Sequence, residues 1–229
     1  MDTILLHALY ILMAYLIGSV SFSYLVGKVF KRIDIREHGS GNPGTTNAFR
    51  VLGKKLGTLV FVLDVIKGGV MITLVLHVLP GNVIHPLVYG LVSAVGHVYP
   101  VFLRFKGGKA VATGVGAFLF YAPVLGMVGL GGYILVLKLT RYVSLGSVFG
   151  TAALMVVSWI IFVIGPEATV PMNWPQMLLG VGGDLVMPIV ATLGLAMITY
   201  RHLGNFKKIR EGTEPKANFL QKRTKHIKS

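Results

Sequence analysis

The stretch AVATGVGAFLFYAPVLGMVGLGGYILVLKL, from Ala110 to Leu139, decides the fold, and Lys138 is its single charged residue. A transmembrane helix needs about 20 apolar residues, so this stretch is too long for one comfortable span and short for two. If it formed one helix, Lys138 and Arg141 would lie outside, together with the basic C-terminal tail. A split at Tyr121-Ala122-Pro123 avoids this and predicts a short helix, Ala110 to Tyr121, followed by a longer one.

The other apolar runs complete a predicted set of seven transmembrane helices, of which the fourth is the short one. We expect the N-terminus outside and the C-terminus in the cytoplasm. This orientation puts all 22 lysines and arginines in cytoplasmic loops or near cytoplasmic helix ends. The predicted spans are Leu5–Val29, Leu56–Leu79, Pro86–Leu103, Ala110–Tyr121, the rest of the opening stretch to Leu139, Leu145–Ile164 and Asp184–Tyr200.

The composition favours an all-α integral membrane protein with a single domain over residues 1–229, in which 201–229 form a basic cytoplasmic tail. Hydrophobic residues make up 54% of the chain and charged residues 13%, against about a quarter in soluble domains. The net charge of +14 is concentrated in short loops beside apolar runs. It therefore indicates topology and attraction to membrane lipid, and no nucleic-acid partner. The absence of cysteine excludes thiolate nucleophiles and cysteine metal sites.

A polar, glycine-rich loop follows the first predicted span. Glycines allow positive φ angles and close backbone approach, and successive amides in such a turn form an anion-binding concavity. Hydroxyls, side-chain amides and an arginine add further donors. The alternative is an ordinary connecting loop that caps the next helix. The candidate phosphate-binding residues here are Ser40, Gly41, Asn42, Gly44, Thr46, Asn47 and Arg50.

Two further basic segments are expected on the same side of the membrane. In Lys106-Gly107-Gly108-Lys109, the glycine pair is predicted to present free N–H groups at a helix start, where the helix dipole favours phosphate. The alternative is that both lysines only anchor the loop inside. The third segment carries Asn205, Gly212 and Glu214 in a basic tail, for which contact with lipid headgroups is the default role.

Three ionisable residues fall inside predicted spans, where they are costly unless paired. Asp64 and Lys67 are three residues apart on one helical face, so we expect them to pair with each other or with a neighbouring helix. His97 lies two turns inside the third span. It is expected either to hold two helices together or to be a buried hydrogen-bonding member of the site.

Several catalytic patterns are absent from the sequence. There is no Gly-x-Ser-x-Gly motif, no phosphate-binding nucleotide loop, and no histidine followed by aspartate four or five residues later. The cytoplasmic carboxylates Asp34, Glu37, Glu211 and Glu214 are too few and too scattered for a metal cluster, so no metal is expected. Such a site is rich in donors and cations and poor in bases, which suits a substrate that already carries a good leaving group.

The segment Gly39-Ser40-Gly41-Asn42-Pro43-Gly44-x-Thr46-Asn47-x-x-Arg50 resembles the first motif of a known family, the bacterial membrane glycerol-3-phosphate acyltransferases that use acyl phosphate. The segment Gly96 to Thr113 resembles their second motif, and Asn205 to Glu214 their third. The similarity covers roughly residues 10 to 216. The chain departs from the family pattern at Thr45, where alanine is usual, at Arg104 and Ala110, where glycine is usual, and at Phe206 and Lys208.

The resemblance implies acyl transfer from acyl phosphate to the 1-hydroxyl of sn-glycerol 3-phosphate, at the cytoplasmic face of the bacterial inner membrane. The products would be lysophosphatidic acid and phosphate, in the first step of phospholipid synthesis, with no metal or cofactor. Catalytic roles are assigned to Ser40, Asn42, Arg50, His97, Lys109 and Asn205. Substrate-binding roles are assigned to Gly41, Gly44, Thr46, Asn47, Lys106, Gly107, Gly108, Ser144, Ser147, Gly212 and Glu214.

Two other functions fit parts of the pattern. A phosphate or organophosphate transporter could use the same loops as a cytoplasmic gate, although the sequence has no internal repeat of the kind common in transporters. A lipid-binding scaffold without activity would not need so many hydrogen-bond donors. The sequence leaves the oligomeric state open, and a monomer is compatible with it.

Overall fold

The structure is a computed structural model that describes residues 3–79, 83–164 and 184–217, and its regular elements in these ranges are all helices. The predicted turn at Pro80–Asn82, the outer loop at 165–183 and the last residues of the tail lie outside the described residues. The main helices are α1 (Thr3–Ser19), α4 (Lys54–Val78), α5 (Pro86–Val98), the short α6 (Val111–Tyr121), α7 (Pro123–Thr140), α8 (Val143–Ile164) and α10 (Val186–Arg210). The short elements are α2 (Phe22–Val26), η1 (Gly27–Lys31), η2 (Ile35–Glu37), α3 (Thr45–Leu52) and η3 (Val101–Leu103).

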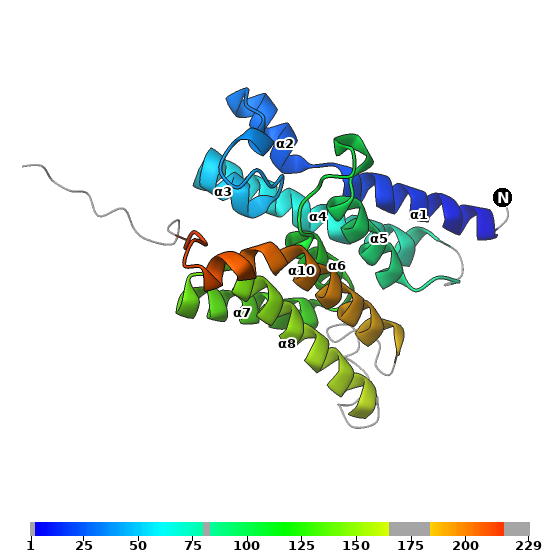
Figure 1. Ribbon diagram of the computed structural model, residues 1–229. Helices are drawn as coiled ribbons and strands as arrows, with labels where there is room; N and C mark the ends of the chain where they lie inside the picture. Colours follow the sequence, from blue (N-terminus) through cyan, green and yellow to red (C-terminus); the bar gives the residue numbers. More distant parts are fainter. Residues whose placement is uncertain (1–2, 80–82, 165–183, 218–229) are drawn as a thin grey trace, which may run out of the picture.

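The helices form two groups that meet at α6 (Figure 1). One group contains α1, α4 and α5, the other contains α7, α8 and α10, and α6 packs against both α4 and α7. The short elements α2 and α3 lie at the same end of the molecule as the C-terminal end of α10, opposite the start of α1. Most of the basic residues are therefore gathered at one end. Lys67, buried near the middle of α4, is an exception to the predicted placement of every cation near a helix end.

The predicted break at Tyr121-Ala122-Pro123 is confirmed, because α6 ends at Tyr121 and α7 begins at Pro123. Proline lacks an N–H donor and clashes with the preceding turn, so α6 cannot continue through it. Five helices are long and apolar enough to cross a membrane, and the bent pair made by α1 with α2 and η1 is a sixth candidate span. The 11 residues of α6 rise only about 17 Å, which is less than the hydrocarbon core of a bilayer.

The first predicted span is not continuous. The chain bends by 42° between α1 and the helical segment Phe22–Lys31, a difference from the single helix expected over residues 5–29. At the break, the Lys67 ammonium on α4 donates a hydrogen bond of 2.7 Å to the carbonyl oxygen of Val20. A side chain from a distant helix therefore satisfies a backbone group that the bend exposes, which is one recognised cause of sharp kinks.

Apolar side chains are distributed between the surface and the interior as expected for a protein in a lipid bilayer. Large apolar side chains are highly exposed, including Val163 at 76%, Leu139 at 75% and Ile4 at 71%. A water-soluble protein rarely exposes so much contiguous apolar surface. The backbones of α4 and α6 approach so closely that a Cβ atom on Gly68 would lie 2.0 Å from the carbonyl oxygen of Thr113. Small residues at helix crossings are typical of membrane helix packing.

Candidate active site

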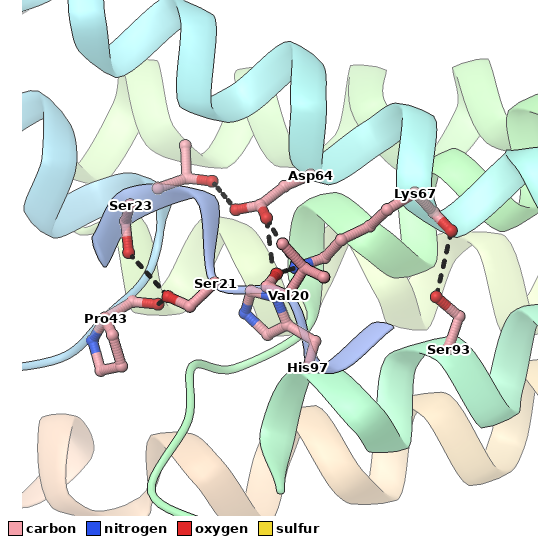
Figure 2. Close-up of polar contacts among 9 residues, drawn as sticks. Val20, Ser21, Ser23, Pro43, Asp64, Lys67, Ser93 and His97 are labelled. Atoms are coloured by element: carbon pink, nitrogen blue, oxygen red, sulfur yellow. Dashed lines mark hydrogen bonds and ion pairs between the residues drawn. The ribbon is translucent and has the colours of Figure 1, made fainter. Parts of the chain in front are cut away.

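A buried ion pair lies at the centre of the first helix group (Figure 2). Asp64 and Lys67 on α4 are 2.8 Å apart and only 1% and 2% exposed. The pairing predicted from their spacing on one helical face is confirmed. Ser93 on α5 donates to the Lys67 carbonyl oxygen at 3.1 Å, so the pair is tied to two neighbouring segments at once.

The Asp64 carboxylate connects two loops that the sequence separates. Its Oδ2 atom accepts a hydrogen bond of 2.9 Å from the hydroxyl of Thr45, at the start of α3 in the first glycine-rich loop. Its Oδ1 atom lies 3.7 Å from Nδ1 of His97 on α5, which leads to the second loop. His97 therefore lies between α4 and α5, as expected of a residue that holds two helices together. Its role as a hydrogen-bonding member of the site stays a prediction.

The Gly107-Gly108 pair is held against the end of α5. Gly107 donates to the carbonyl oxygen of Val98 at 3.2 Å and Gly108 to that of His97 at 3.0 Å. The expectation of free amides at these glycines is therefore wrong, since α6 begins only at Val111 and both amides complete the end of α5. Glycine is required for space, because a Cβ atom on Gly108 would lie 2.1 Å from Nε2 of His97.

The three motif segments come together at this second loop. A Cβ atom on Gly44 in the first loop would lie 3.9 Å from Cα of Gly108, so the two loops are in contact. From α10, the Arg201 guanidinium donates a hydrogen bond of 3.1 Å through Nη2 to the carbonyl oxygen of Gly107. The Nε–H group of Arg201 is buried and has no hydrogen-bond partner among the described residues. It is therefore an available donor where the three motif segments meet.

The second and third motifs share a chain of polar contacts. The Lys109 ammonium donates to Oδ1 of Asn205, and Nδ2 of Asn205 donates to Oε1 of Glu214 at 2.7 Å. The polypeptide turns back toward Asn205 after α10 ends at Arg210, because Gly212 adopts a positive φ of 71° and donates to the carbonyl oxygen of Ile209. Gly212 thus turns the chain after the helix and brings Glu214 back to Asn205. Its predicted contact with substrate stays a prediction.

Positive charge accumulates around Lys109. The pKa of Lys109 is lowered to about 8, mainly by burial; Glu214 opposes this shift, and the nearby charges of Arg201, Lys208 and Arg50 contribute to it. These cations from three different segments favour an anion in the space that they surround. Arg50 also lies against the first loop, since a Cβ atom on Gly39 would be 3.4 Å from its Cδ atom.

The backbone amides of the first loop have internal partners. Ser40 donates to Oδ1 of Asn47 at 2.9 Å, Gly41 donates to the carbonyl oxygen of His38, and Gly44 to that of Asn42. Asn47 is 1% exposed, and its Nδ2 group donates to the carbonyl oxygens at positions 35 and 38. We therefore correct the prediction for Asn47: it shapes the loop, because its donors are already in use. The backbone amides of Ser40, Gly41 and Gly44 are likewise already in use, so the prediction of a nest of free amides is wrong.

Comparison with known proteins agrees with this arrangement. A sequence profile of the family described as glycerol-3-phosphate acyltransferase matches residues 8–212. The chain belongs to this acyltransferase family. It is 42% identical to a glycerol-3-phosphate acyltransferase of Bacillus cytotoxicus over 214 residues, which are 93% of this chain and 96% of the relative. It is also 42% identical to one of Bacillus subtilis over 218 residues, 94% of this chain and 100% of the relative.

Two solved structures share the fold of this acyltransferase. Both are crystal structures of PlsY (YgiH), an integral membrane glycerol 3-phosphate acyltransferase. The glycerol 3-phosphate form aligns with a TM-score of 0.76 and 32% identity, over 91% of this chain and 94% of the other. The lysophosphatidic acid form aligns with a TM-score of 0.72 and 31% identity over the same shares. The multi-pass membrane fold predicted for the acyltransferase is thereby supported by solved relatives.

One site residue of the acyltransferase escaped the sequence prediction, and others have unexpected surroundings. Arg201 was counted only as the start of a basic tail, although its spacing of one helical turn from Asn205 places both on one face of α10. Lys106 is exposed and makes no polar side-chain contact within the described ranges. Ser147 is buried and donates to the carbonyl oxygen of Val143, while the buried hydroxyl of Ser144 has no partner among the described residues. Their contact with substrate stays a prediction.

Three of the departures of the acyltransferase from its family pattern have a visible structural basis. Arg104 and Ala110, which replace usual glycines, adopt positive φ angles of 53° and 56°. The loop thus keeps a glycine-like backbone with residues for which this conformation costs about 1–2 kcal/mol each. Thr45, which replaces a usual alanine, supplies the hydrogen bond to Asp64.

We expect Thr45→Ala to lower the stability of the acyltransferase by about 1.5–3 kcal/mol, because a hydrogen bond to a buried carboxylate is lost. Thermal unfolding in detergent measures this change. Thr45→Ser keeps the donor and should stay close to the wild type, whereas Thr45→Val keeps the shape and should behave like the alanine variant. Equal stability of the serine and valine variants would contradict a role for the hydroxyl.

Glycerol 3-phosphate turnover should fall at alkaline pH. The ammonium form of Lys109 is the one that attracts an anion, and it is lost as pH rises through about 8. We therefore expect kcat/KM to decline about tenfold per pH unit above that value, since kcat/KM reports ionisations of the free enzyme. Lys109→Arg keeps its charge over this range, so the alkaline decline should disappear in whatever activity it retains. A flat wild-type profile up to pH 10 would rule out this assignment.

Proposed function

We propose that the protein transfers a fatty acyl group from acyl phosphate to the 1-hydroxyl of sn-glycerol 3-phosphate, giving lysophosphatidic acid and inorganic phosphate. The observation that carries this proposal is the convergence of Lys109, Arg201 and Arg50 around loops from all three motifs. Family membership supports glycerol 3-phosphate acylation. The forms named for the solved relatives, with glycerol 3-phosphate and with lysophosphatidic acid, match the acceptor and the product.

Acyl phosphate as the donor is supported by the chemistry of the side chains. Asp34, which precedes the first loop, is held by Arg36, whose hydrogen bond keeps the pKa of Asp34 at about 2. A carboxylate with that pKa is a weak base at neutral pH. Asp64 is committed to Lys67 and Thr45. The described residues thus offer cations and donors for phosphate, and little to activate a poor leaving group.

The reaction then proceeds by direct attack. The glycerol hydroxyl oxygen forms a bond to the acyl carbonyl carbon, the bond from that carbon to the phosphate oxygen breaks, and the phosphate leaves with the electron pair. A phosphate oxygen of a substrate takes the hydroxyl proton. Lys109, Arg50 and Arg201 stabilise the negative charge, while Ser40, Asn42, Thr46 and Asn205 orient the substrates.

We also infer seven membrane crossings, with the site on the cytoplasmic face of the inner membrane and α6 as a short crossing covered by its neighbours. The elements α2 and α3 and the C-terminal end of α10 lie at one end of the molecule (Figure 1), and η1, α3 and α10 carry basic residues in their last turns, which supports this orientation. The chain has no cysteine, so single cysteines can be introduced without background. Cysteine at Lys106 should be labelled only from the cytoplasmic side and cysteine at Val83 only from the other side.

The direct test is to incubate the purified protein with palmitoyl phosphate and glycerol 3-phosphate and measure lysophosphatidic acid and released phosphate. We expect the two products in equal amounts. Parallel reactions with palmitoyl-CoA and with palmitoyl acyl carrier protein should give no product. Product from either thioester, with none from acyl phosphate, would refute the donor while leaving the family assignment intact.

A further inference from the structure

The return after α10, residues 211–217, is attached at its far end to the turn between α7 and α8 (Figure 1). The Ala217 amide donates a hydrogen bond of 2.9 Å to the carbonyl oxygen of Arg141. The Lys216 ammonium lies 5.8 Å from the centre of the Tyr142 ring, a distance at which a cation–π interaction stabilises the contact. Ala217 is 4% exposed, so the backbone at this end of the return is packed against the protein.

The turn that receives these contacts is held in place by its own hydrogen bonds. The Arg141 amide donates to the carbonyl oxygen of Leu137 at 2.8 Å, and Arg141 adopts a positive φ of 63°, which ends α7. The Tyr142 amide donates to the Thr140 hydroxyl at 3.2 Å. A carbonyl oxygen just past a helix end has no partner within the helix, and the Ala217 amide supplies one to Arg141.

The near end of the return lies in the polar site. The Glu214 carboxylate accepts a hydrogen bond of 2.7 Å from Asn205, which in turn accepts one from Lys109. Glu214 is only three residues before Ala217, a stretch of chain that spans at most about 10 Å. Pro215 between them has a fixed φ angle and stiffens this stretch. Displacement of Ala217 therefore moves Glu214 with it.

Glu214 opposes the positive charge around Lys109. The charged and titratable groups that face Lys109 come from the return, from α10 and from α3, and are Glu214, Arg201, His202, Lys208 and Arg50. Burial lowers the pKa of Lys109 to about 8, and the Glu214 carboxylate raises it against this effect. Without the carboxylate, Lys109 would lose its proton at a lower pH. A return that stays attached thus keeps Lys109 in its ammonium form near neutral pH.

We propose that the turn between α7 and α8 positions Glu214 in the site through the return after α10, with Tyr142 and Ala217 as positioning residues. The inference rests on the proposed function, since it takes the Lys109 ammonium to hold a substrate phosphate. Tyr142 and Ala217 act on Lys109 only through Glu214. The family profile ends at residue 212, so the attachment at Ala217 lies beyond the matched part of the chain.

Maleimide labelling of Ala217→Cys tests the attachment. The chain has no other cysteine, and the position is 4% exposed, so labelling requires the return to lift. Adding Tyr142→Leu removes the ring that Lys216 contacts and should speed labelling about threefold, as expected for the loss of one exposed cation–π interaction. Adding Tyr142→Phe keeps the ring and should leave the rate unchanged. Equal rates in the leucine and phenylalanine variants would overturn the proposal.

The pH profile of kcat/KM for glycerol 3-phosphate tests the effect on the site. Tyr142→Leu combined with Ala217→Pro lacks both contacts, because proline has no N–H group. We expect its alkaline decline to begin about one pH unit lower than in the wild type, as in Glu214→Gln, since the charge that raises the pKa of Lys109 is displaced. The ratio of kcat/KM at pH 8 to that at pH 6 should therefore fall about fivefold. Tyr142→Phe combined with Ala217→Ser keeps the ring and the amide and should retain the wild-type profile.

The outcomes separate the return from the reaction itself. A double variant that loses activity equally at every pH would show that the turn is only structural, and an unshifted profile in Glu214→Gln would equally overturn the proposal. If the wild type acylates glycerol 3-phosphate from a thioester and not from acyl phosphate, the proposed donor is refuted, and profiles measured with that thioester still decide the role of the return. If the proline variant does not fold, Tyr142→Leu alone provides the measurement, with a smaller shift in the same direction.

Discussion

Lys109→Ala is expected to lose about a thousandfold in kcat/KM for glycerol 3-phosphate, which corresponds to ~4 kcal/mol of transition-state stabilisation. The ammonium is half-buried between the second loop and α10, among other cations. A cation from solution therefore cannot take its place. Its removal also frees Oδ1 of Asn205, which loses its donor. Steady-state kinetics with palmitoyl phosphate, together with thermal unfolding to verify the fold, measures the effect.

Lys138→Ala is the matched control for this charge. Lys138 is an exposed cation in the last turn of α7, so its removal changes the net charge by the same amount without touching the site. Its kcat/KM should remain within about twofold of the wild type, as for most exposed ion pairs and surface charges. If Lys109→Ala retained more than a tenth of the wild-type activity, Lys109 would be a membrane anchor and not a catalytic residue.

Asp64→Ala is expected to produce the largest loss of stability, about 3–5 kcal/mol. The substitution leaves the Lys67 ammonium buried at 2% exposure without its counter-charge, and it removes the shared partner of Thr45 and His97. Unfolding temperature in detergent should fall by roughly 10 °C for a chain of this size. Activity should fall as well, because the two loops lose their common attachment.

A double substitution separates these two consequences. Replacing a buried ion pair by apolar residues of similar size often costs little, so Asp64→Leu with Lys67→Met should recover most of the lost stability. Its activity should remain low, since leucine cannot accept the Thr45 hydrogen bond or attract His97. Recovery of both stability and activity would show that the ion pair is only structural.

Sequence alone predicted the features that depend on local spacing or on charge asymmetry. The break before Pro123 and the Asp64–Lys67 pair are of this kind, because each involves residues close together in the chain. Contacts between distant segments were not predictable. Nothing in the sequence of the first span indicates a bend at Val20, since its cause is a hydrogen bond from Lys67. The contact of Arg201 with Gly107 likewise exists only once α10 lies beside the second loop.

The candidate site, too, was predictable from the sequence only in part. The motif residues were recognisable as donors and cations, and three of them, Lys109, Asn205 and Glu214, form one chain of contacts. Which donors are available to a ligand could not be predicted, because that depends on where each backbone amide finds its acceptor. The sequence suggested free glycine amides, whereas the structure leaves side chains as the available donors.

The attachment of the second loop to α5 has a consequence for turnover. Gly107 and Gly108 complete the last turn of α5, so lifting this loop would unwind the end of a membrane helix. We therefore expect the second loop to stay in place during turnover. Entry of glycerol 3-phosphate is then expected to depend on the other segments around the site, the first loop and the short return after α10. The return after α10 is held by only a few contacts, among them the hydrogen bond from Asn205 to Glu214.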